Sequence, residues 1–322
     1  MNNNRFFKPQ EQFVLESGIV LSNLELVYQT FGSLNQQGNN VVWCFHALTA
    51  NTDVIDWWSG LFGVSTIFDP SEYFIICVNS IGSPYGSSRP GSLEFPLFTV
   101  RDVAKSQLLL ADYLGIQHLK VAIGGSFGGS QALEFAYSFS GEIDQLILIA
   151  CVAKESPWGI AIHESQRLAL VSDSSFGESN GGTAGLKTAR AIGVLTYKTV
   201  QSFKETQMET DNRVDDFRAA SYISYQGDKF TKRFDAMSYY YLTKCLDTHN
   251  VGRNRDGVAA ALNSIQYSTI VIGISSDQLI AIEEVKEMAD HIPNAKFYQI
   301  DSKYGHDGFL LETDKISNII TN

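Results

Sequence analysis

Short apolar runs rich in β-forming residues alternate with segments of helical periodicity along most of this chain. The runs are Leu24–Phe31, Val41–Phe45, Tyr73–Asn79, Leu119–Gly124, Gln145–Cys151, Thr269–Ile274 and Lys296–Ile300. Several are almost continuously apolar, as strands buried on both faces of a parallel sheet should be. Between them, segments such as Val100–Leu114 and Gln131–Phe139 carry apolar residues at helical spacing. This repetition predicts an α/β fold with a mostly parallel central sheet flanked by helices.

The alternation stops between about residues 155 and 250. Helix-like pieces there, at Ala161–Val171, Ala184–Val200 and Tyr239–Asp247, flank a polar, glycine-containing stretch around Asp173–Gly185. We therefore predict a core domain built from residues 1–154 and 251–322, with residues 155–250 inserted as a helical lid. Since 44% of the 322 residues are apolar, the chain can bury one large core and still carry such an appended layer.

Charge and composition exclude several classes of partner. The formal net charge of −11 would not attract nucleic acid or an anionic membrane. No apolar run approaches the roughly 20 residues of a membrane-spanning helix, and the first residues lack a signal-peptide pattern. The four cysteines are scattered and form no CxxC pair, so we expect reduced structural thiols and no metal. The sequence predicts a cytoplasmic protein that binds neither nucleic acid nor membrane.

A glycine-rich segment joins a predicted strand to a predicted helix. It reads Gly124-Gly125-Ser126-Phe127-Gly128-Gly129. G-x-S-x-G between a strand and a helix is the nucleophile elbow of the α/β-hydrolase fold, in which glycines permit a turn too tight for side chains and the serine faces the substrate. The alternative is a glycine-rich turn whose serine only caps the helix. A nucleotide-binding loop is excluded, because the Walker lysine and the G-x-G-x-x-G spacing are both missing.

A nucleophilic Ser126 requires a histidine as base, and in this fold that histidine follows the serine in the chain. His306 lies in a loop after the last strand-like run, where functional groups are often carried. His249 ends a lid-like helix, and His291 reads as a surface residue of an amphipathic helix. His306 is therefore the predicted base; the alternative is a solvated loop histidine.

The acid that orients the base should lie between the serine and the histidine. Asp277 follows the run Thr269–Ile274 and is placed at the carboxyl end of a strand. Asp301 also ends a strand, but it lies only five positions before His306 and is the second choice. Asp277 is the predicted acid.

The fold also needs two backbone N–H groups that stabilise the oxyanion. One comes from the residue after the nucleophile, Phe127. The other comes from the loop after an early strand, here His46-Ala47-Leu48-Thr49-Ala50, and we prefer Leu48. Because His46 precedes the serine, it is interpreted as a buried or loop-orienting histidine instead of a catalytic one.

Several stretches of the chain resemble one family, the homoserine O-acetyltransferases of methionine biosynthesis. They are His46–Thr49 (HALT), Gly124–Glu134 (GGSFGGSQALE), Ser221–Phe230 (SYISYQGDKF), Phe234–Tyr239 (FDAMSY), Tyr241–Lys244 (YLTK) and Tyr304–Asp307 (YGHD). The resemblance covers nearly the whole chain, including the predicted lid. A generic serine hydrolase would share the elbow but not the lid motifs.

This resemblance implies that Ser126 takes an acetyl group from acetyl-CoA and passes it to the hydroxyl of L-homoserine in a ping-pong reaction, with no metal or bound prosthetic group. It also implies a homodimer. Arg190 is expected to bind the amino-acid carboxylate, Asp307 the ammonium group, and Tyr197 to line the acceptor pocket. The alternatives are a solvated helix residue for Arg190 and the N-cap of a helix at Gly308–Ile316 for Asp307.

The sequence departs from the family pattern in two places. Arg89 lies in the segment Gly86–Ser92, where the family usually has small residues and a proline, so the preference for acyl donor or acceptor is open. The segment around Ser172–Gly185 is compact, which bears on the dimer contacts that the lid supplies in the family.

Three other functions are weighed against the acetyltransferase. A serine esterase shares the triad and passes the acyl group to water. An O-succinyltransferase, or an enzyme with L-serine as acceptor, would use the same chemistry. It would differ only in the size of the acyl pocket or in one methylene of the acceptor. A ligand-binding receptor built on an inactive hydrolase fold would normally lack a triad residue, and none is missing here.

Overall fold

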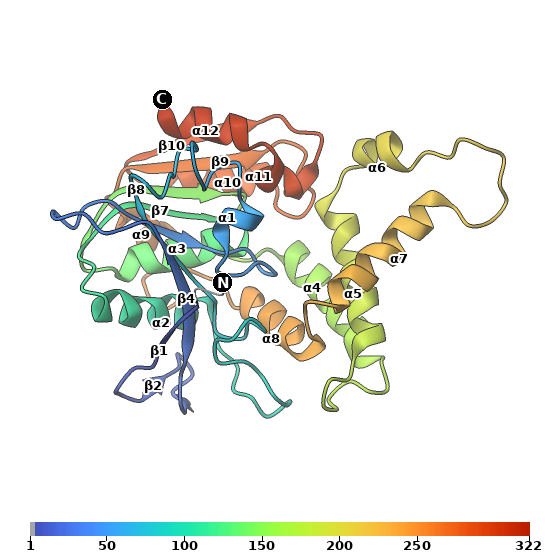
Figure 1. Cartoon of the computed structure of the whole chain (residues 1–322), viewed down its shortest axis with the longest axis horizontal. Coiled ribbons are helices and arrows are strands. Elements are labelled where there is room, and N and C mark those ends of the chain that lie inside the picture. Colours follow the sequence, from blue (N-terminus) through green and yellow to red (C-terminus); the bar gives the residue numbers. More distant parts are fainter. Residues whose placement is uncertain (1–3) are drawn as a thin grey trace.

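An eight-stranded β-sheet forms the centre of the computed structural model, which describes residues 4–322 (Figure 1). The strands, in their order across the sheet, are β1 (Arg5–Phe7), β4 (Leu26–Phe31), β6 (Phe74–Val78), β5 (Val41–Phe45), β7 (His118–Gly125), β8 (Glu142–Ile149), β9 (Thr269–Ile274) and β10 (Ala295–Ile300). From β6 to β10 all neighbours are parallel, whereas β4 is antiparallel to β6 and β1 to β4. The mostly parallel sheet and its seven predicted strands are confirmed.

The shortest strands were not predicted from the sequence. β1 has three residues, and β2 (Phe13–Val14) pairs with β3 (Val20–Leu21) in a separate two-stranded sheet. Strands of two or three residues are too short to show an alternating pattern.

Helices cover both faces of the sheet. One face carries α2 (Val100–Tyr113), α3 (Phe127–Ser138), α9 (Val258–Asn263) and α10 (Ile282–Asp290). The other carries α1 (Val54–Trp57), α11 (Gly308–Leu311) and α12 (Thr313–Thr321). The expected helix Gly308–Ile316 is therefore two helices, because the backbone at Glu312 (φ −88°, ψ 41°) leaves the helical region.

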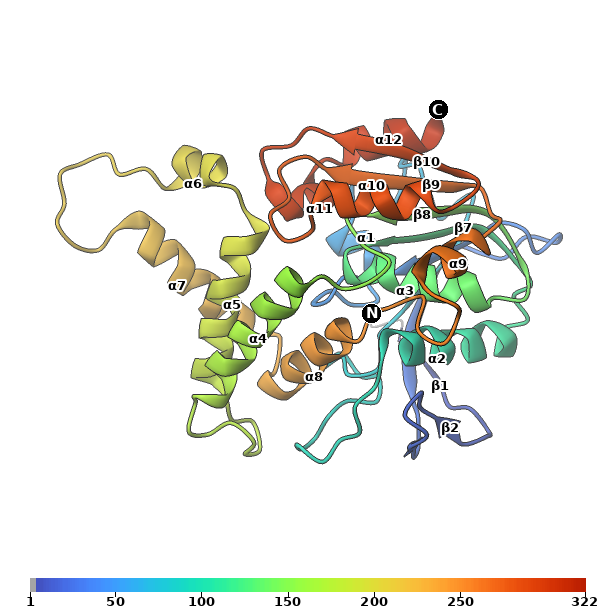
Figure 2. The same ribbon diagram turned by 180° about the vertical axis from the view of Figure 1, so that it is seen from behind.

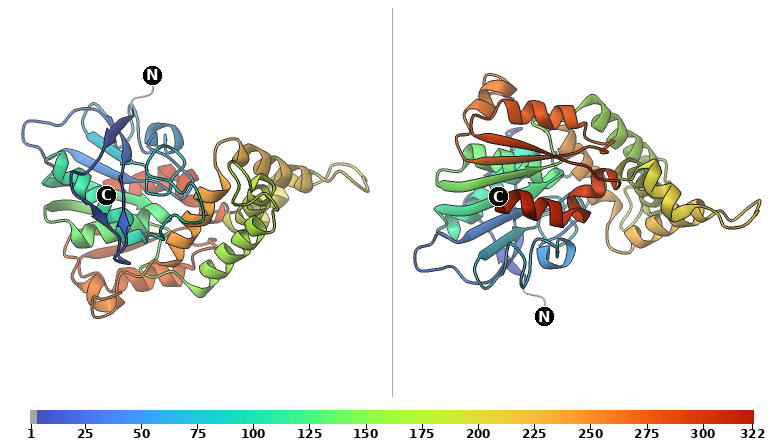
Figure 3. Two further views of the ribbon diagram at one scale, coloured as in Figure 1. Left: turned by 90° about the horizontal axis from the view of Figure 1, so that it is seen from below. Right: turned by 90° about the horizontal axis from the view of Figure 1, so that it is seen from above.

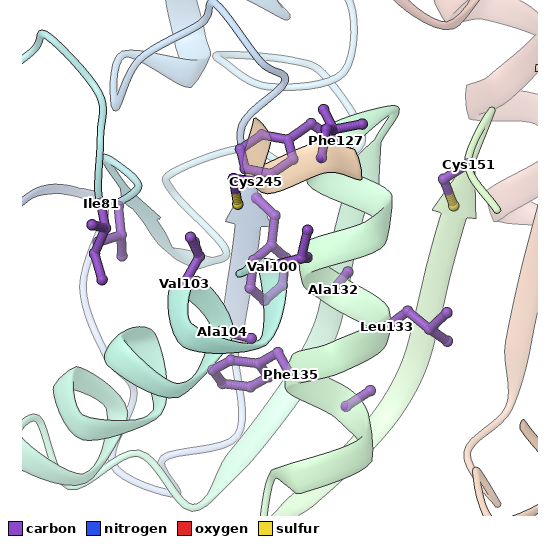
Figure 4. Packing of buried hydrophobic residues seen from close by; sticks show 14 of the residues in the cluster. Ile81, Val100, Val103, Ala104, Phe127, Ala132, Leu133, Phe135, Cys151 and Cys245 are labelled. Atoms are coloured by element: carbon purple, nitrogen blue, oxygen red, sulfur yellow. The ribbon is translucent and has the colours of Figure 1, made fainter. Parts of the chain in front are cut away.

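Strand β5 shows why the predicted strands were so apolar. Val41, Trp43 and Phe45 face one buried cluster, while Val42 and Cys44 face the other. Both faces are covered, so no polar residue alternates with the apolar ones. On the first face, Val103 and Ala104 of α2 belong to the same buried cluster as Phe135 of α3 (Figure 4). All four cysteines are buried and unpaired.

The segment between β8 and α9 forms a group of helices at one end of the core (Figures 2 and 3). These helices are α4 (Pro157–Val171), α5 (Thr183–Tyr197), α6 (Val200–Gln207), α7 (Arg218–Thr231) and α8 (Ala236–Asp247). An antiparallel bridge between Lys154 and Asn250 joins the two chain segments where the insertion leaves the core. The helix α5 packs against both α4 and α7. None of the helices in residues 4–322 is long and apolar enough to cross a bilayer.

The piece predicted as Ala184–Val200 ends earlier than expected. Helix α5 stops at Tyr197, and Thr199 then begins α6 as its N-cap, with its hydroxyl accepting a hydrogen bond from the Ser202 N–H at 3.0 Å. The side chain of a capping threonine satisfies a free N–H in the first turn of a helix, while its own backbone is not helical. Thr199 therefore separates α5 from a second helix.

Candidate active site

Ser126 lies in a strained turn between β7 and α3. Its backbone has φ 55° and ψ −126°, a conformation that non-glycine residues rarely adopt, and its N–H donates to Ile149 O at 2.9 Å. The flanking glycines are sterically required. A Cβ on Gly124 would lie 2.2 Å from the Gly128 backbone, and one on Gly128 would lie 2.0 Å from Phe45 O. The elbow can therefore form only with glycine at both positions.

The structure brings Ser126, His306 and Asp277 together. His306 Nε2 lies 2.8 Å from Ser126 Oγ, and His306 Nδ1 lies 2.6 Å from Asp277 Oδ2. The three side chains come from the turn after β7, from the loop after β10 and from the loop after β9, all at the carboxyl ends of neighbouring parallel strands. This is the edge at which open α/β sheets build their sites.

The Asp277 carboxylate is held on both of its oxygens. Oδ1 accepts hydrogen bonds from the N–H groups of Leu279 and Ile280 at 2.9 and 3.0 Å, so Oδ2 faces His306. Burial alone would lower the pKa of His306, but the negative Asp277 stabilises the imidazolium and the net pKa is raised. Asp301, the second choice, is exposed and contacts Gln299 instead of the histidine.

Two backbone N–H groups are available beside Ser126. Phe127 is the first residue of α3, and Leu48 lies in the loop after β5. Within residues 4–322 neither N–H donates a hydrogen bond, and both residues line the same cavity as Ser126. A free N–H at a helix start and a free N–H in a facing loop are the donors that an oxyanion requires.

This cavity has a volume of about 410 Å³ and lies between the core and the inserted helices. Its lining contains Ser126 and His306 from the core together with Arg190, Tyr197 and Asp307. All the residues that the sequence analysis assigned to the substrate are thus brought to one cavity. In the part of the chain that the structure describes, no three His, Cys, Asp or Glu side chains are grouped so that they could hold a metal ion.

Arg190 is half-buried on α5, between two aromatic rings. Its guanidinium carbon lies 5.0 Å from the ring centre of Phe230 and 5.5 Å from that of Tyr197. Its Nε is buried and has no hydrogen-bond partner among the described residues. Arg190 is therefore not a freely solvated helix residue, and a guanidinium whose buried N–H has no partner can bind an anionic ligand.

Asp307 is the last residue of a 3₁₀ turn and makes no capping hydrogen bond to the helix that follows. Its Oδ2 lies 3.2 Å from Lys198 Nζ. Asp307 therefore occupies the N-cap position of α11, as the alternative expected, but its carboxylate does not cap the helix and is free to face the cavity. Tyr197 stacks obliquely on the base, with its ring centre 5.9 Å from that of His306.

Further polar side chains line the cavity and were not predicted from the sequence, among them Arg233, Glu155 and His163. Arg233 donates to Thr49 O at 2.6 Å and to Tyr85 Oη at 2.8 Å. Glu155 and His163 contribute another wall, and burial raises the pKa of Glu155. Their positions depend on how the inserted helices dock on the core, which no local sequence pattern reveals.

Arg89, the departure from the family pattern, is mostly exposed and lies 3.5 Å from Asp235. It is not among the residues that line the cavity. Its effect on substrate choice would have to be indirect.

Comparison with known proteins first identifies the fold class of the chain. Residues 40–313 match the model of the alpha/beta hydrolase fold. Among solved structures, esterase E22 superimposes with a TM-score of 0.88 at 19% identity, covering 98% of both chains. The homoserine O-acetyltransferase from Bacillus anthracis superimposes with a TM-score of 0.90 at 20% identity, covering 99% of this chain and 97% of the other. At such identities these likenesses establish the fold alone.

Sequence relatives define the family more narrowly. The homoserine O-acetyltransferase of Cyclobacterium marinum is 41% identical over 98% of this chain and 93% of its own length. That of Saccharomyces cerevisiae is 34% identical over 96% of this chain and 84% of its own length. The chain belongs to the homoserine O-acetyltransferase family, and it is an acyltransferase that acts on small molecules.

Proposed function

We propose that this enzyme transfers an acetyl group from acetyl-CoA to the hydroxyl of L-homoserine, with Ser126, His306 and Asp277 as nucleophile, base and acid. The observation that carries the proposal is the presence of Arg190 in the cavity that contains Ser126, with a buried Nε that nothing in residues 4–322 satisfies. A simple esterase does not need a cation in this place. An acceptor with a carboxylate does.

In the first half-reaction His306 Nε2 takes the proton of Ser126 Oγ, over the observed 2.8 Å. The Ser126 oxygen bonds to the thioester carbon, and charge moves to the thioester oxygen, where the N–H groups of Leu48 and Phe127 stabilise it. The carbon–sulfur bond then breaks, and the proton on His306 passes to the departing CoA sulfur. Asp277 stabilises the imidazolium during both transfers.

In the second half-reaction His306 takes the proton of the homoserine hydroxyl, whose oxygen attacks the acetyl-serine. The ester bond to Ser126 breaks, and the proton returns to Ser126 Oγ. Arg190 binds the carboxylate of the acceptor and Asp307 its ammonium group, while Tyr197 lines the space between them and the base. This sequence of steps is a ping-pong acyl transfer and needs no bound cofactor.

The inserted helices are proposed to act as the lid that limits water. An acyl-enzyme that waits for an acceptor must be shielded from hydrolysis. Residues 155–250 supply the cavity wall that contains Glu155, His163, Arg190, Tyr197 and Arg233. The domain division at residues 154 and 251 remains a prediction that this wall supports.

A homodimer formed through the lid is also proposed. The helices α5 to α7 and the loops between them expose large apolar side chains, namely Leu195, Val200, Met208, Val214, Phe217 and Tyr225. Exposed apolar residues gathered on one part of a surface mark an interaction site. Light scattering after size exclusion should give twice the chain mass of 35.6 kDa, and a monomer would contradict the proposal. The cytoplasmic location stays a prediction from the sequence.

The function is tested by the release of CoA thiol from acetyl-CoA, measured with and without L-homoserine. Release that depends on both homoserine and Ser126 is the expected result, and Ser126→Ala should abolish it. Release that is indifferent to any amino acid would identify an esterase. A preference for succinyl-CoA or for L-serine in parallel assays would keep the mechanism and change the substrate.

A further inference from the structure

His46 is completely buried at the start of the loop that carries Leu48, and the mechanism above gives it no role. Both of its ring nitrogens make contacts. Nδ1 lies 2.8 Å from the carbonyl oxygen of Ala47, and Nε2 accepts a hydrogen bond from the N–H of Ser80 at 2.9 Å. These partners are backbone groups, which cannot exchange donor and acceptor roles.

The partners fix the tautomer of His46. A backbone N–H can only donate, so Nε2 must carry a lone pair toward Ser80. The Ser80 hydroxyl lies 3.1 Å from the same nitrogen but can donate to Gln131 Oε1 at 3.0 Å instead. In a neutral imidazole the proton is then on Nδ1, where it is donated to Ala47 O. Burial lowers the pKa of His46 to about 4, which keeps the ring neutral at ordinary pH.

The Ala47 carbonyl, which accepts this hydrogen bond, belongs to the same peptide group as the Leu48 N–H. A trans peptide is planar, and its C=O and N–H point in opposite directions. Ala47 O also accepts the N–H of Ala50 at 3.0 Å. With the carbonyl held by two donors, the Leu48 N–H is directed to the opposite side of the peptide, and Leu48 itself lines the cavity. Hydrogen bonds in series polarise one another, so the donation at Ala47 O also strengthens the Leu48 N–H as a donor.

The hydrogen bonds around His46 also extend to the helix that carries the second oxyanion donor, Phe127. Gln131, one turn after Phe127 on α3, donates from Nε2 to the backbone carbonyl of His46 at 3.0 Å. Its Oε1 accepts from the Ser80 hydroxyl. Ser80 and Gln131 thus hold His46 at a fixed position relative to the helix that provides the Phe127 N–H.

We propose that His46 is a positioning residue, which orients and polarises the Ala47–Leu48 peptide so that the Leu48 N–H can stabilise the oxyanion. The inference rests on the function proposed above only through the assignment of Leu48, and it applies equally to acyl transfer and to ester hydrolysis at Ser126. It predicts that the Nδ1 position of His46 matters for turnover and that the Nε2 position matters for stability.

Two amide substitutions separate these positions. In His46→Asn, the amide nitrogen falls close to the place of Nδ1 and can still donate to Ala47 O, while the contact with Ser80 is lost. In His46→Gln, the amide reaches the place of Nε2 and can accept from Ser80, while the donation to Ala47 O is lost. The assays are CoA release with L-homoserine, hydrolysis of p-nitrophenyl acetate, and thermal unfolding.

We expect His46→Gln to lower kcat by roughly 10-fold to 100-fold in both assays, with KM little changed, since removal of an oxyanion donor costs about 10²- to 10³-fold and misorientation costs less. His46→Asn should keep kcat within a few-fold of the wild type although it unfolds at a lower temperature than His46→Gln. The order of activity and the order of stability are therefore opposite. Equal losses, or losses that follow stability, would assign His46 a structural role only and overturn the proposal.

A measurement on the unmodified enzyme covers the case in which a variant does not fold. The ¹⁵N shifts assigned to His46 in the histidine-labelled enzyme should be those of a neutral ring protonated on Nδ1; a His46 ring protonated on Nε2, or on both nitrogens, would refute the proposal. If the wild type hydrolyses p-nitrophenyl acetate but does not transfer to homoserine, the proposed function fails while the His46 comparison still stands. If it does neither reaction, both fail.

Discussion

Replacing Asp277 with Asn would change which nitrogen of His306 carries a proton while leaving the packing almost unchanged. The N–H groups of Leu279 and Ile280 donate to Asp277 Oδ1, so in the variant the amide oxygen must stay at that position. The amide NH₂ then faces His306 Nδ1, which must accept a hydrogen bond. The ring proton moves to Nε2 and is donated to Ser126 Oγ, and the base can no longer take the serine proton.

The size of the effect follows from the cost of turning the amide around. A flipped amide in Asp277→Asn would restore an acceptor for His306 but would face its NH₂ toward two backbone donors. Leaving both N–H groups unsatisfied costs roughly 2–6 kcal/mol at about 1–3 kcal/mol each. At about 1.4 kcal/mol for each factor of ten, turnover should fall by roughly 30-fold to 10⁴-fold. The upper end matches the loss of about 10⁴-fold known for the wrong tautomer in a serine triad.

The assay is kcat for CoA release, with thermal unfolding to show that the variant is folded. The ¹⁵N spectrum of His306 should change from a ring protonated on Nδ1 to one protonated on Nε2. Asp301→Asn is the matched control, because Asp301 is exposed, precedes the same histidine and does not contact it. Its kcat should be unchanged. A folded Asp277→Asn enzyme with kcat within threefold of the wild type would show that Asp277 does not set the tautomer of His306.

Three other outcomes are expected. Because the base must be neutral and Asp277 raises the pKa of His306 above its usual 6.5, kcat/KM should fall as the pH drops through a value above 6.5, and this limb should move to lower pH in Asp277→Asn; an unshifted limb would contradict the assignment. Gly128→Ala should lower the free energy of unfolding by about 3 kcal/mol, measured in urea, because its Cβ would lie 2.0 Å from Phe45 O, whereas Gly91→Ala, with nothing within 4 Å, should change it by no more than about 0.5 kcal/mol. Arg190→Ala or Asp307→Ala should lower kcat/KM for homoserine by roughly 10-fold to 100-fold and leave the acetylation rate of Ser126 unchanged; equal losses in both half-reactions would indicate a structural role.

The sheet could be predicted because its strands are buried on both faces. A strand such as Val41–Phe45 consists only of apolar residues, and the sequence shows this directly. The lid was harder to predict. Helix α7 contains Gly227, which in isolation suggests a break, yet a Cβ there would lie 2.5 Å from Lys187 Cγ on α5. The glycine permits close packing of two helices, and that reason is visible only in the tertiary structure.

The active site likewise contains residues that could be predicted from the sequence and residues that could not. Ser126, Asp277 and His306 follow a chain order that the fold imposes, so their proximity could be predicted from the sequence. Arg233 and His163 reach the cavity only because the inserted helices dock on the core. Arg233 contacts Thr49, far away in the chain, and His163 is oriented by Asp247 from another helix at 2.8 Å. Neither contact has a local signature.

Mass spectrometry of the acyl-enzyme shows whether Ser126 carries the acetyl group between the two substrates. The enzyme is mixed with acetyl-CoA alone, quenched and digested, and the peptide that contains Ser126 is examined before and after L-homoserine is added. One acetyl group is expected on Ser126, which persists in water and is discharged by homoserine with formation of O-acetylhomoserine. No acetylation of this peptide, or discharge at the same rate without homoserine, would contradict it.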